Sequence, residues 1–586
     1  MRLIEIRLLD GPNVYRLEPV VKIELAVGRR RTWYGQRKPG RHALVLLGAK
    51  VPAREWPNDV ASLVQWVRRL RADHDEGRAG TAVHRSSDPG HWIVTFPWSG
   101  AERARAIAEE AVRLAERDVS PSRTARLTGA QTRFRERSDG RIRAGGTTPP
   151  TWIRDDDRRM PAVSISGTNG KSTVTRLITH ILVLAGRHVG TTTSDGVLVD
   201  ERMVDPGDWT GPGGALQILR RSDIDVAVLE TARGGILLRG VGYESNEASV
   251  LTNVTSDHLD LQGIHTLPEL AEVKATICRI TKPDGWVVLN ADDPLCAAVG
   301  RRVRGRVALF SLKGTRSAAI RRHVRRGGRA YVLGDGELVE IEGDRSRSLV
   351  DVAEVPIAIG GLARHNGANA LAAAGAARAL GATLGQVADG LRDFRPSSER
   401  SPGRMNIYRL GARVVIVDFA HNEAGIDAVL DVAQGIAGGA AGRAAPVTAI
   451  IGTAGDRPDD TLRGIGRIAA RRAQRVVIKE TKKYLRGRSS SSVVGELMAG
   501  IRAGGRPTTD IPVYESETEA LSMELAGSAG ADPSGRPDAP RVIVLMCHEE
   551  REEVFRLLAD LGARPVDVAS ELTELVPRLQ GRPRRG

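Results

Sequence analysis

The 586-residue sequence has only three cysteines, Cys278, Cys296 and Cys547, which are far apart and lack the spacing of metal ligands. This scarcity argues against a disulfide scaffold and a cysteine-based zinc site, and it fits a reducing cytoplasm. No apolar run approaches the ~18 residues that a membrane-spanning helix needs. Residues 1–7 alternate like a strand, without the cleavage site of a signal peptide. We therefore expect a cytoplasmic protein with no membrane partner.

The composition, with 41% hydrophobic and 27% charged residues, is typical of a globular protein. The chain is too long for one hydrophobic core, so three or four domains are expected. The net charge is +15. A positive net charge can indicate that the protein binds nucleic acid, an anionic membrane or an acidic substrate. An arginine-rich surface that contacts only water explains the charge equally well.

Residues 1–120 have the pattern of a small α+β domain. Strands are expected there at Leu3–Leu9, Val20–Val27 and Trp92–Phe96. Helices are expected at Asp59–Asp73 and Ala101–Arg117. Trp66 and Trp92 are predicted to be core residues, whereas Trp33 lies among arginines in a combination that can bind a polyanion. Residues 121–160 are polar and contain proline and glycine, which predicts a linker.

From residue 161 onward, short apolar strands alternate with helices, which is the pattern of a parallel sheet. The first block has strands expected at Ala162–Ser166, Val226–Leu229, Ser249–Thr252 and Val287–Leu289, and helices at Lys171–Ala185 and Pro268–Ile280. Residues 301–355 are interpreted as a strand-rich insertion. We assign residues 161–395 to a central α/β domain and residues 396–586 to a C-terminal, Rossmann-like domain. Its strands are expected at Val414–Val417, Thr448–Ile451, Val476–Ile478 and Val542–Leu545.

A turn that contains two glycines joins the strand Ala162–Ser166 to the next helix. Its residues are Gly167, Thr168, Asn169, Gly170, Lys171, Ser172 and Thr173. Backbone N–H groups at such a helix start can bind phosphates. Lys171 can neutralise the terminal phosphates of ATP, and the Ser172 hydroxyl can bind Mg²⁺. Ile165 stands where the general P-loop pattern has its first glycine, yet Lys171 and Ser172 favour a phosphate site over a plain glycine turn.

Polar residues follow the neighbouring strands. Glu230 ends one strand, and Asn253 ends the next, followed by Asp257 and His258. Because ligands bind at the carboxyl ends of parallel strands, Glu230 and His258 are expected to face the phosphate loop. A carboxylate and an imidazole there can hold a second Mg²⁺. Taken singly, each residue could instead cap an element or form a salt bridge.

The loop Gly-Thr-Asn-Gly-Lys-Ser resembles that of the Mur ligase superfamily, which includes folylpolyglutamate synthases and cyanophycin synthetase. Longer runs are similar to the Mur-ligase-like half of cyanophycin synthetase, at residues 191–196, 207–212, 230–237, 455–457 and 479–488. Residues 9–15 resemble the start of that enzyme. Cyanophycin synthetase has an ATP-grasp module between its N-terminal domain and its Mur-ligase-like half. This chain has no room for such a module there, because only a short linker separates its N-terminal domain from the phosphate loop.

The resemblance implies roles for further residues. Asn366 and Asn369 would lie near adenine, Arg404 would contact phosphate, and Asp418 would meet the ribose. Lys274 resembles a lysine that is carbamylated in many Mur ligases and then reaches Mg²⁺; alternatively, it neutralises phosphate or lies on the surface. Phe419 departs from the tyrosine usual in the family, and Glu423 from the usual proline.

The function that this resemblance implies is an ATP-dependent carboxylate–amine ligase working through an acyl phosphate, with C-terminal residues 418 and 479–488 completing the site on closure. The catalytic residues would be Lys171, Glu230, His258, Lys274 and Arg404, and the Mg²⁺ ligands Ser172, Glu230, His258 and Lys274. The expected substrates are an amino acid and an acidic peptide or small carboxylic acid. The alternatives are a folylpolyglutamate- or muramyl-peptide-type ligase and, in another class, a nucleotide-binding regulator or nucleic-acid-binding ATPase. Nucleic acid is not the partner we expect, and the oligomeric state is not indicated.

Overall fold

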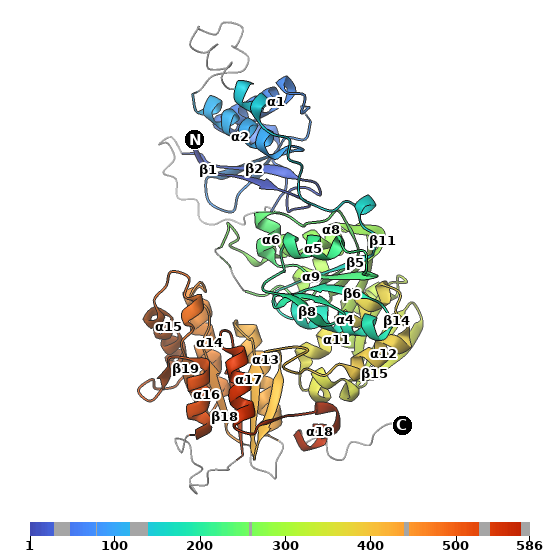
Figure 1. Ribbon diagram of the computed structural model, residues 1–586, viewed down its shortest axis with the longest axis vertical. Coiled ribbons are helices and arrows are strands. Elements are labelled where there is room, and N and C mark those ends of the chain that lie inside the picture. The colour runs from blue at the N-terminus through green and yellow to red at the C-terminus, as the bar shows by residue number, and fades with distance from the viewer. Residues whose placement is uncertain are drawn as a thin grey trace.

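The computed structural model of the protein describes residues 1–28, 47–77, 79–117, 139–256, 259, 261–438, 445–526 and 540–575. Three separate sheets organise this part of the chain and follow one another along the molecule (Figure 1). The first lies within residues 2–97, the second within 162–351 and the third within 406–565. The α/β fold class expected from the sequence is confirmed.

The N-terminal domain is an antiparallel sheet in the order β1-β2-β4-β3, with two helices on one face (Figure 1). Its elements are β1 (Arg2–Leu9), β2 (Val20–Ala26), α1 (Asn58–Asp73), β3 (Ala82–Arg85), β4 (His91–Pro97) and α2 (Ala101–Glu116). Trp66 and Trp92 are buried in the core, as predicted. The cluster around Trp33 lies outside the described residues, and the short strand β3 was not predicted.

The central domain contains an eleven-stranded sheet in the order β15-β14-β13-β12-β11-β10-β5-β9-β6-β7-β8. Its strands are β5 (Ala162–Ser166), β6 (Val189–Thr192), β7 (Gly196–Val199), β8 (Arg202–Pro206), β9 (Val226–Glu230), β10 (Asn246–Leu251), β11 (Thr281–Asn290), β12 (Arg306–Ser311), β13 (Arg329–Gly334), β14 (Glu337–Glu342) and β15 (Arg345–Asp351). The strands from β13 to β6 are parallel, and antiparallel strands extend the sheet at both ends.

Helices cover both faces of this sheet, which explains why its parallel strands are apolar runs buried on both sides. One face carries α4 (Lys171–Leu184), α11 (Arg364–Ala379) and α12 (Leu384–Asp393). The other carries α5 (Pro212–Leu219), α6 (Arg233–Leu238), α7 (Leu267–Lys274), α8 (Thr276–Arg279), α9 (Pro294–Val299) and α10 (Ala318–Val324). None of the helices in the described part of the chain is long and apolar enough to cross a membrane.

Two sequence predictions for this domain were wrong. Residues 301–355 are strand-rich, as predicted, but they are part of the central sheet, because β12 and β13 continue its parallel strands and β14 and β15 form a hairpin at its edge. The single helix expected at Pro268–Ile280 is divided into α7 and α8. The backbone of Ala275, with φ −67° and ψ −8°, interrupts the regular α-helical geometry between them.

The C-terminal domain has a seven-stranded sheet in the order β20-β19-β18-β21-β17-β16-β22, of which β20 to β17 are parallel. Its strands are β16 (Asn406–Leu410), β17 (Arg413–Asp418), β18 (Val447–Ile451), β19 (Arg475–Lys479), β20 (Val513–Tyr514), β21 (Arg541–Met546) and β22 (Arg564–Pro565). Its helices are α13 (Glu423–Ala437), α14 (Asp459–Arg472), α15 (Ser490–Ala503), α16 (Glu517–Ala526), α17 (Arg551–Asp560) and α18 (Val568–Leu575). Helices on both faces of a parallel sheet are the Rossmann-like arrangement that was expected.

Candidate nucleotide site

The predicted phosphate loop joins β5 to α4, and both of its glycines adopt backbone conformations that other residues rarely adopt. The φ angle is +147° at Gly167 and +88° at Gly170. A β-carbon on Gly167 would lie 1.9 Å from Oγ1 of Thr252, and one on Gly170 would lie 2.3 Å from Oδ1 of Asn369. Glycine is therefore needed at both positions for the loop to approach its neighbours.

The segment that follows β10 holds this loop in place by hydrogen bonds. The Asn253 carbonyl accepts a hydrogen bond from the Thr168 N–H at 2.8 Å, and Oδ1 of Asn253 accepts one from the Asn169 N–H at 3.0 Å. Oγ1 of Thr252 donates to the Asn169 carbonyl at 2.7 Å. The start of α4 is thus fixed at the carboxyl edge of the sheet, where its N–H groups can receive a phosphate.

Three of the predicted catalytic and metal-binding residues lie close to this helix start. Nζ of Lys171 donates to the Thr168 carbonyl at 2.9 Å, and Oγ of Ser172 donates to Oε1 of Glu230 at 3.2 Å. Glu230 is 3% exposed, and its Oε2 has no hydrogen-bond partner among the described residues. Burial raises the pKa of Glu230, while Lys171 and Arg404 oppose that rise. An unpartnered buried carboxylate oxygen beside a serine hydroxyl fits a bound Mg²⁺.

The two remaining predicted metal ligands differ in what the structure shows. Lys274 is buried at the end of α7, and its Nζ donates to the Gly167 carbonyl at 2.6 Å. Its amine therefore lies at the phosphate loop, and carbamylation stays a prediction. His258 lies outside the described residues, so its role also stays a prediction.

A cavity of about 210 Å³ lies beside the loop, between the central and C-terminal domains. The residues assigned from the sequence that line it are Asn169, Gly170, Thr173, Asn366, Asn369, Arg404 and Asp418. They come from the phosphate loop, the start of α11 and the region around β17. The fold therefore brings residues that are up to 249 positions apart (169 and 418) to one cavity.

The polar groups of this cavity are ordered by hydrogen bonds. Nδ2 of Asn369 donates to Oδ1 of Asn366 at 3.0 Å, and both side chains are buried. The Asp418 carboxylate accepts from the N–H groups of Met405 and Ala420, both at 2.8 Å. Burial raises the pKa of Asp418, and these two bonds oppose the rise. The side chains are thus held in place from within the protein.

Arg404 reaches from the C-terminal domain to the phosphate loop. Its Nη2 donates to Oγ of Ser172 at 3.3 Å, and its guanidinium lies 4.7 Å from the centre of the Phe419 ring. Phe419, which replaces the usual tyrosine, thus still offers an aromatic face to this cation. The sequence analysis also missed His365, which lines the cavity. Burial lowers its pKa to about 4, so its ring is neutral at pH 7.

Direct contacts join the two domains around the loop. Asn169 and Asn422 exchange two hydrogen bonds, of 3.3 and 3.0 Å. Asp195 accepts from Arg176 of α4 at 2.9 Å and from Arg551 of α17 at 2.8 Å. Burial would raise the pKa of Asp195, but the nearby arginines lower it to about 2. The carboxylate therefore stays charged and bridges the domains at neutral pH.

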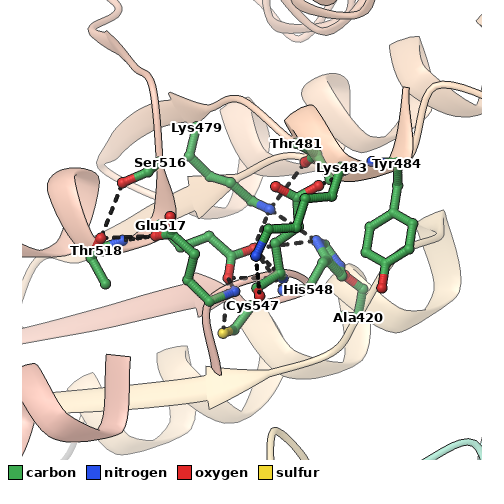
Figure 2. A network of polar contacts seen from close by, with 12 residues as sticks. Ala420, Lys479, Thr481, Lys483, Tyr484, Ser516, Glu517, Thr518, Cys547 and His548 are labelled. Carbon is green, nitrogen blue, oxygen red and sulfur yellow. Dashed lines mark hydrogen bonds and ion pairs between the residues drawn. The ribbon is translucent and has the colours of Figure 1, made fainter. Parts of the chain in front are cut away.

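A buried polar network is hydrogen-bonded to Ala420, which lines the cavity (Figure 2). Nζ of Lys479 lies 2.5 Å from Oε1 of Glu517 and 3.0 Å from Nδ1 of His548. Because an ammonium only donates, Nδ1 accepts, and Nε2 of His548 donates to the Ala420 carbonyl at 3.0 Å. The network is thereby attached to the turn that follows Asp418. Residues 479–488 were expected to complete the nucleotide site on closure. The amine of Lys479 instead contacts Glu517 and His548 within this network.

The fold and site together define a P-loop α/β protein with a polar cavity beside the loop, between two domains. Residues 165–377 match the family model described as the Mur ligase middle domain, and residues 403–546 match that of the Mur ligase glutamate ligase domain. A UDP-N-acetylmuramoyl-L-alanyl-D-glutamate--2,6-diaminopimelate ligase from Alkalilimnicola ehrlichii is 30% identical over 64% of this chain and 70% of its own length. The chain belongs to the Mur ligase family.

Other known proteins are also similar to a large part of the chain. Cyanophycin synthetase from Crocosphaera subtropica is 39% identical over 367 residues, which is 63% of this chain and 41% of that protein. The chain therefore spans about two fifths of the length of this relative. A solved structure of E. coli FolC in complex with DHPP and ADP aligns over 68% of this chain and 88% of its own, with 18% identity and a TM-score of 0.48.

Proposed function

We propose that the protein is an ATP-dependent ligase that forms an amide bond between a carboxylic acid and an amine. The observation that carries the proposal is the convergence of Lys171, Ser172, Glu230 and Arg404 at one phosphate loop beside the cavity. The relatives named above as a cyanophycin synthetase and a diaminopimelate ligase support the same reaction class.

The chemistry requires activation of the acid, because a carboxylate is negatively charged and has no good leaving group. Transfer of the γ-phosphoryl group of ATP to a carboxylate oxygen gives an acyl phosphate and ADP. The amine then attacks the carbonyl carbon and loses a proton, phosphate leaves, and an amide remains. Positioning and charge neutralisation dominate such transfers.

The charged and hydroxyl groups that meet at the loop have separate roles in this scheme. Lys171 and Arg404 neutralise charge that develops on the transferred phosphoryl group. Ser172 and Glu230 would hold Mg²⁺, with His258 and carbamylated Lys274 as the further ligands we propose. The bound ion would supply positive charge to the phosphate oxygens. Contacts such as Asn169–Asn422 keep the C-terminal domain over the loop and exclude water from the acyl phosphate.

For the substrates, we propose an amino acid as the amine and an acidic peptide or small carboxylic acid as the acid. The similarity to cyanophycin synthetase and the positive net charge support this choice. We also propose the cytoplasm as the location, in keeping with three free, buried cysteines.

A screen of acid–amine pairs with ATP tests the proposal, with ADP release followed continuously and the product identified by mass spectrometry. We expect ADP release that depends on both substrates and a product whose mass equals their sum less one water. Lys171→Ala should abolish this release, whereas Lys50→Ala, at an exposed position in the N-terminal domain, should not. Substrate-dependent ADP release by Lys171→Ala near the parent rate would overturn the assignment.

A further inference from the structure

A strongly basic surface covers one region of the central domain outside the nucleotide site. Between residues 294 and 334 the chain has ten arginines, one lysine and no acidic residue. All of these cations except Arg329 are exposed. We call the exposed set the α10 surface, and its members are Arg301, Arg302, Arg304, Arg306, Lys313, Arg316, Arg321, Arg322, Arg325 and Arg326.

The chain carries these cations from the start of β12 to its carboxyl end and then back through α10 to the start of β13, a path that we call the row. The helix lies over β12 and β13, with Ile320 buried beneath it. Lys313 follows the carboxyl end of β12, and Arg306 begins that strand. The guanidiniums of Arg306 and Arg329 both lie on Trp286, at 4.7 and 4.4 Å from its ring centre. The row therefore runs the length of a six-residue strand, roughly 20 Å.

The charges of this row are not neutralised within the described part of the protein. Only Arg302 forms an ion pair with a described carboxylate, that of Glu272 at 2.5 Å. Arg321 and Arg325 donate to backbone carbonyls. By contrast, Arg472 in the C-terminal domain pairs with two aspartates. Unpaired like charges side by side repel one another, so a polyanion that supplies the missing charge should bind here.

We propose that the α10 surface binds an acidic polypeptide in an extended conformation. Arginine guanidiniums match carboxylates in a two-point geometry. A single-stranded nucleic acid would also need aromatic platforms for its bases. The aromatic residues of this region do not offer them, since Phe310 and Tyr331 are buried and Trp286 is covered by two guanidiniums.

The position of the row relates it to the nucleotide cavity. Lys313 stands next to Leu312, whose side chain would be 3.5 Å from a β-carbon on Gly367 in α11. Gly367 follows Asn366, which lines the cavity. One end of the α10 surface is thus near the cavity, so an acidic acceptor bound along the surface would have its end close to that cavity. This choice of occupant rests on the proposed function.

Fluorescence anisotropy with labelled poly-L-aspartate of increasing length, without ATP, tests the inference. We expect binding that weakens with salt and that strengthens with length up to about six residues, the number that extends over the row. The variant Arg322→Glu/Arg325→Glu/Arg326→Glu should raise the Kd about tenfold or more, because it reverses three charges that would attract the carboxylates of the polymer.

The matched control changes the same charge at exposed arginines elsewhere, as Arg68→Glu/Arg105→Glu/Arg471→Glu, and should leave the Kd within about twofold. If the charge reversal prevents folding, glutamine at the same three positions should still weaken binding. Unchanged binding by a folded α10-surface variant would overturn the inference. Tighter binding of single-stranded DNA than of poly-L-aspartate, lost in the same variant, would identify nucleic acid as the occupant instead.

Failure of the ligase proposal is distinguishable from failure of this inference. Lys171→Ala should bind poly-L-aspartate as the parent does, because Lys171 is not part of the α10 surface. A protein that ligates but does not bind the polymer refutes the inference alone. A protein that binds the polymer through the α10 surface but releases no ADP with any acid–amine pair refutes the ligase proposal alone.

Discussion

The ammonium of Lys479 and the carboxylate of Glu517 are both almost completely removed from water. Such a pair is stable only when the desolvation cost is offset by close geometry and further hydrogen bonds. Glu517 meets this condition, because it also accepts from the N–H groups of His548, Glu549 and Glu550. The same network holds the turn after β17, so the stability of the C-terminal domain and the shape of the cavity depend on it together (Figure 2).

The variant Glu517→Gln should strongly destabilise the C-terminal domain. Burial would raise the pKa of Glu517, but Lys479 lowers it from 4.5 to about 2. Because the folded pKa is below the unfolded value, the carboxylate contributes stability above pH 4.5, and this contribution is lost as the pH falls toward 2. Removing the charge leaves Lys479 buried and unpaired, at a cost of about 3–5 kcal/mol. Thermal unfolding from pH 7 to pH 3 measures both effects.

The matched control is Glu515→Gln, which removes an exposed carboxylate 2.7 Å from Lys482. Water already solvates that pair, so the unfolding temperature should not change measurably. An equal loss of unfolding temperature in both variants would contradict a special role for the buried pair.

At the level of secondary-structure elements, the site depends on how closely three segments meet. The loop between β5 and α4 touches the end of β10 on one side and α11 on the other. Gly167 and Gly170 allow this approach, since neither position has room for a side chain. The start of α11 therefore lies against the loop, and its Asn366 and Asn369 line the cavity there.

The variant Gly170→Ala should lower nucleotide affinity by about tenfold or more, because the new methyl group would collide with Asn369 and strain the loop. Titration with a fluorescent ATP analogue measures this. Gly186→Ala is the control, because Gly186 also has a positive φ, +82°, but open space around it. It should lose stability without losing affinity. Parent-like affinity in Gly170→Ala would show that the loop is not where the nucleotide binds.

The sequence predicts most of these elements to within a few residues, because buried parallel strands are unbroken apolar runs and the phosphate loop has a fixed spacing. It does not predict that β12 to β15 continue the central sheet, since a strand pattern carries no information about its neighbour. Nor does it predict the network of Lys479, Glu517 and His548, whose members come from three segments far apart in the sequence. The sequence also gives no indication that His365 lines the cavity, because a single histidine forms no recognisable pattern.

On the scale of the whole molecule, the nucleotide cavity belongs to neither domain alone. The central domain supplies the phosphate loop and α11, and the C-terminal domain supplies Arg404 and Asp418. Asp195 of the central domain pairs with Arg551 of the C-terminal domain, and Arg176 of α4 pairs with the same carboxylate. Nucleotide bound between the domains would therefore favour the arrangement in which they contact each other, which is the condition for excluding water from an acyl phosphate.

Calorimetric titration of the full chain with a non-hydrolysable ATP analogue and Mg²⁺ tests the central claim most directly. We predict one nucleotide per chain in the parent and in Lys50→Ala, and affinity at least about tenfold lower in Lys171→Ala, which lacks the loop ammonium. The absence of nucleotide binding by the parent, or equal affinity in Lys171→Ala, would contradict the account.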